Sequence, residues 1–280
     1  MTLCIVTATT NWTRARPCIE SWGLDDYEII VVCNGGTTGQ DHGVNNRITW
    51  LTTPDYLGSV PAFRLGVDYA LGQSKSDVIA CFHDDLLLQD PDWGRKVLRR
   101  FHDQPAIGLL GFGGAIELGA HDMYETPYQP MSLARHGFRS NLQDAEVHGL
   151  RSLLPERVAC LDGFSQIGRR ALWAGLSRKD EGDNTPSRQV KYQRPWTVLH
   201  ELGFVHHFYD GALGCLAARY GWETWYLPIR CQHFGGQTAV GDEGYQRWAQ
   251  RQHPQGDQGF WQDAHRHGYD AFKDVLPLRV

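Results

Sequence analysis

The chain has 280 residues, of which 41% are hydrophobic and 21% are charged. This composition suits one large α/β domain or two small ones, and it excludes a mainly disordered chain. No run of about 18 apolar residues occurs, so no segment is expected to span a membrane, and the net charge of −5 argues against a strong general binder of polyanions.

Short apolar runs separated by polar or helical stretches occupy the first 112 residues. Each run is only a few residues long and is apolar along its whole length, which is typical of strands covered on both faces of a parallel sheet. The runs are residues 3–6, 29–32, 48–51, 78–82 and 107–110.

Two helices are predicted between these strands. Val60, Phe63 and Val67 share one helical face, and Ser59 is expected to be the N-cap of that helix. Asp90 is expected to open a second helix after the fourth apolar run. The resulting βαβαβ order predicts a doubly wound half of the kind that binds nucleotides.

The remaining chain has weaker patterns. Residues 113–158 are rich in Gly, His, Tyr, Pro and Gln, and we expect a long active-site surface with one or two short helices. The later predicted elements are a strand at 158–161, a helix at 170–176, a polar loop at 177–195, a helix at 211–220, a strand at 225–229 and peripheral helices within 238–280.

The cysteines indicate a reducing environment. There are seven, an odd number, with no CxxC pair, and several lie inside apolar runs. We therefore expect reduced, buried cysteines and a cytoplasmic protein.

A polar cluster, His83-Asp84-Asp85, directly follows the predicted strand at 78–82. Ligands of open α/β sheets bind at the carboxyl ends of strands. Carboxylate oxygens suit hard divalent cations, which in turn bind diphosphates. Acidic pairs are common at strand ends, so this cluster alone does not establish a metal site.

Two more polar positions are open to alternative interpretations. Asp210 precedes the helix predicted at 211–220, where it serves either as an N-cap or as a catalytic group, and a low pKa is expected for it there. His233 follows the strand predicted at 225–229 and is either a ligand or a turn residue.

The order of these features, over roughly residues 2–236, resembles the family 2 glycosyltransferases of the GT-A fold. The resemblance implies an α/β chain with a Rossmann-like, doubly wound, mostly parallel sheet, an acceptor-side subdomain and peripheral C-terminal helices. It also implies a glycosyltransferase domain at 1–236, with a nucleotide-binding half at 1–112 and an acceptor half at 113–236, and a helical extension at 237–280.

The resemblance assigns roles to particular residues. Asp85 and His233 correspond to the ligands of a catalytic Mn²⁺ or Mg²⁺, and Asp210 corresponds to the catalytic base. His83 and Tyr209 depart from the pattern, because the family has acidic residues at both positions. The residues that match donor-side or sugar-side positions are Thr7, Thr9, Asn34, Asp55, Asp84, Asp162 and Gly163.

The activity implied is transfer of a sugar from a nucleoside-diphosphate sugar, a UDP-sugar, to an acceptor hydroxyl with inversion at the anomeric carbon. A cation would stabilise the charge on the diphosphate, and Asp210 would take the proton of the hydroxyl. The acceptor expected first is a saccharide or glycan. A hydroxymethylated base in DNA is the second choice, because acidic residues interrupt the basic side chains between 169 and 194.

Other classes of function remain open. A metal-dependent hydrolase or nucleotidyltransferase can use the same sheet, and His200-Glu201 near His206 and His207 invites a zinc interpretation. The spacing is not HExxH, however, and Gly203 interrupts the segment. A non-catalytic protein that binds sugar nucleotides is the third class.

Overall fold

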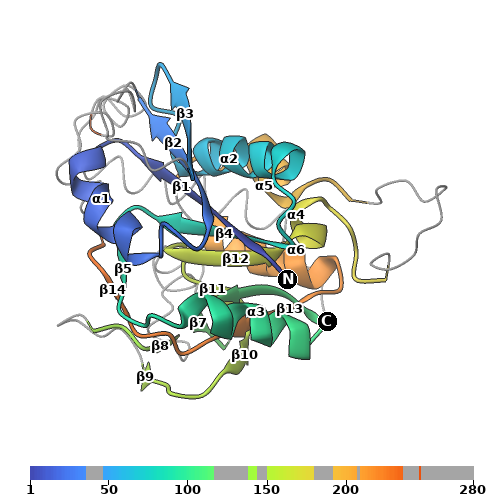
Figure 1. The fold of residues 1–280 in the computed structure, drawn as a ribbon. Helices are drawn as coiled ribbons and strands as arrows, with labels where there is room; N and C mark the ends of the chain where they lie inside the picture. Colours follow the sequence, from blue (N-terminus) through green and yellow to red (C-terminus); the bar gives the residue numbers. More distant parts are fainter. Residues whose placement is uncertain are drawn as a thin grey trace, which may run out of the picture.

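The computed structural model describes residues 1–35, 47–116, 138–143, 150–179, 192–206, 209–235 and 246. Over these residues the predicted α/β class is confirmed: a mixed, mostly parallel sheet of eight strands lies between two layers of helices (Figure 1). The strands lie in the order β10 (Glu156–Val158), β13 (Glu223–Tyr226), β6 (Ile107–Gly111), β12 (Ser165–Arg169), β4 (Val78–His83), β1 (Leu3–Thr9), β2 (Glu28–Asn34) and β3 (Ile48–Thr53).

The five predicted apolar runs all form strands of this sheet. Strands β3, β2, β1 and β4 are neighbours in that order and pair in parallel, as in the first half of a doubly wound nucleotide-binding sheet. β12 lies antiparallel between β4 and β6. This insertion carries a later part of the chain into the middle of the sheet, next to the end of β4.

Two separate apolar cores cover the two faces of the sheet. Successive side chains of β1 point to opposite faces, so Leu3 and Ile5 belong to one core and Cys4 and Val6 to the other. The first core contains α1 (Trp12–Ser21) and α3 (Trp93–Asp103). The second core contains α2 (Ser59–Gln73), α4 (Arg170–Trp173), α5 (Pro195–Glu201) and α6 (Tyr209–Arg219).

Two smaller sheets complete the described fold. One has the order β11 (Cys160–Leu161), β7 (Gly113–Ala115), β8 (Phe138–Ser140) and β9 (Leu150–Arg151). In the other, β14 (Cys231–His233) pairs antiparallel with β5 (Leu86–Leu88). Short strands thus occupy the described parts of 113–158, where short helices were expected, while 117–137 and 144–149 lie outside the described residues.

Both predicted helix starts need correction. Helix α2 begins at Ser59 itself and follows Gly58, whose φ is 89°, while the Ser59 hydroxyl lies 2.7 Å from Nδ1 of His206. Helix α3 begins at Trp93, and Asp90 instead accepts a hydrogen bond from the backbone N–H of Asp92. In both cases the polar side chain has a better partner than the helix N-terminus.

Other differences follow from local chemistry. The strand predicted at 225–229 ends at Tyr226, before Pro228, which has no N–H for a strand ladder. Helix α5 was not predicted, because it is only seven residues long and lies next to the polar loop. The segment 180–191 of that loop and, apart from Gln246, the peripheral helices expected within 238–280 lie outside the described residues.

The seven cysteines are all buried and none forms a disulfide, as expected. Within the described residues, no helix combines the length and apolar character that crossing a bilayer requires.

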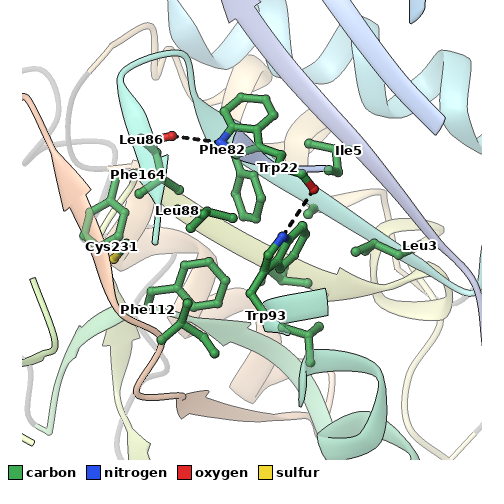
Figure 2. Packing of buried hydrophobic residues seen from close by; sticks show 14 of the residues in the cluster. Leu3, Ile5, Trp22, Phe82, Leu86, Leu88, Trp93, Phe112, Phe164 and Cys231 are labelled. Carbon is green, nitrogen blue, oxygen red and sulfur yellow. Dashed lines mark hydrogen bonds between the residues drawn. The ribbon is translucent and has the colours of Figure 1, made fainter. Parts of the chain in front are cut away.

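A pair of tryptophans fixes the short strand β5 against the core (Figure 2). The indole N–H of Trp22 donates to the carbonyl of Leu86 at 2.8 Å, and the indole N–H of Trp93 donates to the carbonyl of Trp22 at 3.2 Å. The ring of Phe82 packs edge-on against Trp22, with centroids 5.3 Å apart. These contacts tie β5 to the end of α1 and to α3.

Replacing Trp22 by phenylalanine should lower the free energy of unfolding by about 2 kcal/mol, because the buried carbonyl of Leu86 loses its donor and a cavity forms. Urea denaturation measures this loss. Trp225→Phe is the matched control: its indole is half-buried and bonds a side chain, Glu223. We expect it to cost less than about 1 kcal/mol; equal losses in the two variants would contradict the anchoring role of Trp22.

Candidate active site

The end of strand β4 gathers three side chains that can hold a metal ion. Strand β4 ends at His83, and Asp84 and Asp85 connect it to β5. Strand β14 pairs with β5, which places His233 opposite Leu86. The backbone N–H of Phe234 also donates to the carbonyl of Asp85 at 3.1 Å. As a result the potential ligand atoms of His83, Asp85 and His233 all lie within 4.8 Å of one another. We call these three residues the cation group.

The members of the cation group are held in place by ring packing. Oδ1 of Asp85 lies 3.2 Å from Nε2 of His233 and 4.0 Å from Nδ1 of His83. The His233 ring stacks on Phe164 with centroids 4.9 Å apart, and the His83 ring lies parallel to Phe63 at 6.3 Å. The carboxylate is buried and both imidazoles are half-buried.

The protonation states of the group fit a divalent cation. Burial opposes ionisation of Asp85, but His233, His83 and Arg14 together outweigh it and lower its pKa to about 2. Burial also lowers the pKa of His83 to about 4, against the opposing charge of Asp85. At neutral pH the group therefore offers a carboxylate and a neutral imidazole, which are the forms that bind metals.

Asp84 has a different role from its neighbour Asp85. The hydroxyl of Thr9 donates to the carboxylate of Asp84 at 2.7 Å, and the guanidinium of Arg14 lies 3.3 Å from the same carboxylate. Burial and the charge of Asp85 raise the pKa of Asp84 to about 6, although Arg14 and Thr9 oppose the shift. Asp84 thus ties β1 and α1 to the end of β4, and Arg14 places a positive charge at this edge of the sheet.

The residues expected at the nucleoside end are mostly buried. Thr7 is fully buried, so the structure leaves it no surface for a nucleotide to touch. The amide of Asn34 accepts from the N–H of Leu57 at 2.7 Å and donates to the carbonyl of Gly58 at 3.3 Å. Asn34 therefore braces the turn before α2, while Asp55 in the same turn is exposed.

The turn at 162–164 lies beside the cation group because β12 pairs antiparallel with β4. The N–H of His83 donates to the carbonyl of Phe164 at 3.1 Å. The hydroxyl of Tyr209 lies 2.7 Å from Nε2 of His83 and 3.3 Å from the carbonyl of Gly163. A Cβ atom at Gly163 would lie 2.5 Å from that hydroxyl, so any larger residue here would require the buried Tyr209 ring to shift.

Asp210 is the half-buried carboxylate on the other side of this turn. Helix α6 begins at Tyr209, so Asp210 belongs to the first helical turn and is not an N-cap before residue 211. Burial and the nearby charge of Asp162 raise its pKa to about 7, against hydrogen bonds from the backbone of Gly211 and Gly163. The expectation of a low pKa was wrong, because burial and the second carboxylate outweigh the helix N-terminus.

The residues of the zinc interpretation do not assemble in the described part of the chain. His200 is exposed at the end of α5, and His206 bonds Ser59. His207 lies outside the described residues.

Sequence reasoning missed three features of this site. It placed His83 in the metal-capable cluster but did not group it with His233, and it did not connect Tyr209 to His83 or Arg14 to Asp84. The signal for His83 was present in its position at the strand end. The two contacts join residues 126 and 70 positions apart, so no local pattern indicates them.

Comparisons with known proteins found only distant structural similarities. No family model matches the chain, and neither does any curated protein. A mannosyltransferase from Pyrobaculum calidifontis in complex with GDP-Man and Mn²⁺ is 12% identical, with 98% of this chain and 73% of that chain covered and a TM-score of 0.45. Glucosyl-3-phosphoglycerate synthase from Mycobacterium tuberculosis, in complex with Mn²⁺, UDP and phosphoglyceric acid, is 13% identical, with coverages of 89% and 76% and a TM-score of 0.47.

A mycobacterial protein is 14% identical, with coverages of 92% and 76% and a TM-score of 0.48. Solved structures similar to this chain thus include nucleotide-sugar glycosyltransferases. Because these TM-scores are below 0.5, the similarities support no conclusion about the fold or the activity of this chain.

Replacing Asp210 by asparagine should stabilise the protein in a pH-dependent way. A carboxyl whose pKa is raised on folding binds its proton more tightly in the folded state, so ionisation costs stability as the pH rises from the unfolded pKa to the folded one. The melting temperature of Asp210→Asn should therefore equal that of the wild type near pH 4 and exceed it increasingly up to pH 7 and above, where the gain levels off. Asp55→Asn makes the same replacement at an exposed carboxylate and is the control for effects of the substitution itself. A destabilised Asp210→Asn at pH 8 would show that the carboxylate supports the helix instead.

Proposed function

We propose that this protein is an inverting glycosyltransferase that moves a sugar from a nucleoside-diphosphate sugar, a UDP-sugar, to an acceptor hydroxyl with the help of Mn²⁺ or Mg²⁺. One observation carries the proposal: the turn at 162–164 touches both the cation group and Asp210. Phe164 bonds His83 on one side, and Asp162 raises the pKa of Asp210 on the other. Groups suited to a leaving diphosphate and to an attacking hydroxyl are thus adjacent.

The diphosphate would bind at the cation group. Asp85 and His233 would hold the metal ion, with His83 beside them. When bound, a divalent cation supplies positive charge that stabilises the phosphate oxygens as the sugar leaves. Arg14 adds a fixed positive charge at the same edge, held there by Asp84.

Asp210 would act as the general base. A pKa of about 7 keeps a useful fraction of the carboxylate ionised near neutral pH and makes it a stronger base than an ordinary Asp. As the acceptor oxygen attacks the anomeric carbon, Asp210 takes the proton and the bond from that carbon to the diphosphate breaks. A single base and a direct displacement invert the configuration.

The donor's nucleoside would lie against the turn that Asn34 braces, with Asp55 as its accessible carboxylate. Thr9 would act through Asp84, and Gly163 would lie under the sugar. We propose a glycan hydroxyl as acceptor. A hydroxymethylated base in DNA is the competing acceptor and is an outcome of the test.

The decisive experiment incubates the EDTA-treated protein with UDP-sugars and a panel of glycans or hydroxymethylated DNA, with and without Mn²⁺. We expect Mn²⁺-dependent release of UDP together with transfer of the sugar to an acceptor. Release of UDP with only free sugar as product would indicate a hydrolase. Binding without release would indicate a non-catalytic sugar-nucleotide-binding protein.

Asp85→Ala should abolish Mn²⁺-dependent binding of UDP, because a water molecule does not replace a carboxylate oxygen in a preformed site. Isothermal titration calorimetry with UDP at saturating Mn²⁺ measures this. The exposed Asp92, which pairs with Arg95, provides the control Asp92→Ala and should bind UDP as the wild type does. Unchanged UDP affinity in Asp85→Ala would remove the basis of the metal assignment.

Asp210→Asn should reduce turnover by about 10²–10⁴-fold, the usual contribution of general-base catalysis, without changing the affinity for UDP and Mn²⁺. Asp162→Asn should retain turnover, but it removes a negative charge that raises the pKa of Asp210. The acidic limb of its pH–rate profile should therefore move to lower pH. The opposite result, with normal turnover in Asp210→Asn and lost turnover in Asp162→Asn, would assign the base to Asp162.

A further inference from the structure

Tyr209 and His83 come from distant parts of the chain and form one of the shortest side-chain contacts at the site, 2.7 Å between the phenolic oxygen and Nε2. Both side chains depart from the sequence pattern of the resembled family, where acidic residues occupy these positions. Tyr209 is almost completely buried and His83 half-buried. A buried hydrogen bond of this kind fixes the direction of both partners.

The hydrogen-bond pattern determines which nitrogen of His83 carries the proton. The Tyr209 oxygen also lies 3.3 Å from the carbonyl of Gly163, which can only accept. If the hydroxyl donated to Nε2 instead, two oxygen atoms with lone pairs would face each other in a buried space. The consistent arrangement has Nε2–H of His83 donating to Tyr209, and Tyr209 donating to Gly163.

This arrangement leaves a lone pair on Nδ1 of His83. Nδ1 is the atom that lies 4.0 Å from Oδ1 of Asp85, close enough for one ion to contact both. The ring cannot turn freely, because it lies parallel to Phe63 on one side and its centroid is 5.5 Å from that of His233. His83 therefore presents a metal-binding nitrogen toward the other two members of the cation group.

We infer that His83 is a third metal ligand, that Tyr209 is the positioning residue that holds it, and that the site therefore prefers transition-metal cations such as Mn²⁺ or Co²⁺ to Mg²⁺. Two imidazole nitrogens and one carboxylate suit first-row transition metals, whereas Mg²⁺ favours oxygen ligands and retains its water. The inference rests on the proposed function only in taking the same cation group as the metal site.

The test uses the full chain freed of metal by EDTA and titrated with MnCl₂, CoCl₂ or MgCl₂ alone. The wild type should bind Mn²⁺ and Co²⁺ more tightly than Mg²⁺. Tyr209→Phe keeps the ring and removes the hydroxyl, and it should weaken Mn²⁺ binding about 10–100-fold, the usual effect of losing an outer partner of a ligand. His83→Phe keeps a ring against Phe63, removes both nitrogens and should weaken binding further.

Two controls separate ligation from a general loss of structure. Tyr220→Phe removes another tyrosine hydroxyl that bonds a backbone carbonyl, that of Gln193, far from the cation group, and should leave Mn²⁺ binding unchanged. The visible spectrum of bound Co²⁺ reports its ligands directly, and it should change in His83→Phe but not in Tyr220→Phe. If Tyr209→Phe does not fold, the visible spectrum of Co²⁺ bound to His83→Phe decides whether His83 is a ligand.

The outcomes distinguish this inference from the proposed function. Mn²⁺ binding that is lost in Asp85→Ala but unchanged in Tyr209→Phe and His83→Phe would overturn the inference and leave the glycosyltransferase proposal standing. Metal binding that depends on His83, in a protein that binds no sugar nucleotide, would support the inference and contradict the glycosyltransferase proposal. A wild type that prefers Mg²⁺ would also overturn the inference.

Discussion

The antiparallel pairing of β14 with β5 is the constraint on which the candidate site depends. It places His233 opposite Leu86, next to a carboxylate that follows a strand from the other half of the chain. Strand β5 is short, and its position is fixed by the indole of Trp22 and, behind it, that of Trp93. The position of β5, and with it that of His233, is therefore set by an apolar core.

The inserted strand β12 gives the site its second half. By pairing with β4 it brings Asp162 and Gly163 to the strand end, where α6 then places Asp210. The acidic residues there are in different electrostatic states. Asp85 is held ionised by histidines, whereas burial and a like charge raise the pKa values of Asp84 and Asp210. Asp85 and Asp210, whose pKa values are separated, are suited to different tasks: Asp85 to binding a cation and Asp210 to moving a proton.

The sequence predicted the parts of this structure that depend on local pattern. Continuous apolar runs predicted the central strands, and the polar cluster directly after one of them drew attention to His83, Asp84 and Asp85 at the strand end. The ligand role of His233 was implied only by the family resemblance, and His233 lies inside β14, a strand that the sequence did not predict. Side-chain partners could not be predicted in the same way. Ser59 bonds His206 and does not cap a helix, Asn34 braces a turn, and the pKa of Asp210 depends on a carboxylate from another segment. Each depends on a contact that only the folded chain creates.

Position 163 is a glycine, and the close approach of Tyr209 to it limits how this site can change in evolution. Because Tyr209 occupies the space that a Cβ atom at 163 would need, and because the same hydroxyl bonds His83, positions 83, 163 and 209 are mutually dependent. A substitution at any one of them alters the surroundings of the other two. Neutral drift is therefore restricted there, and homologues should differ at these positions jointly, with an acidic residue at 83 accompanied by a residue other than tyrosine at 209.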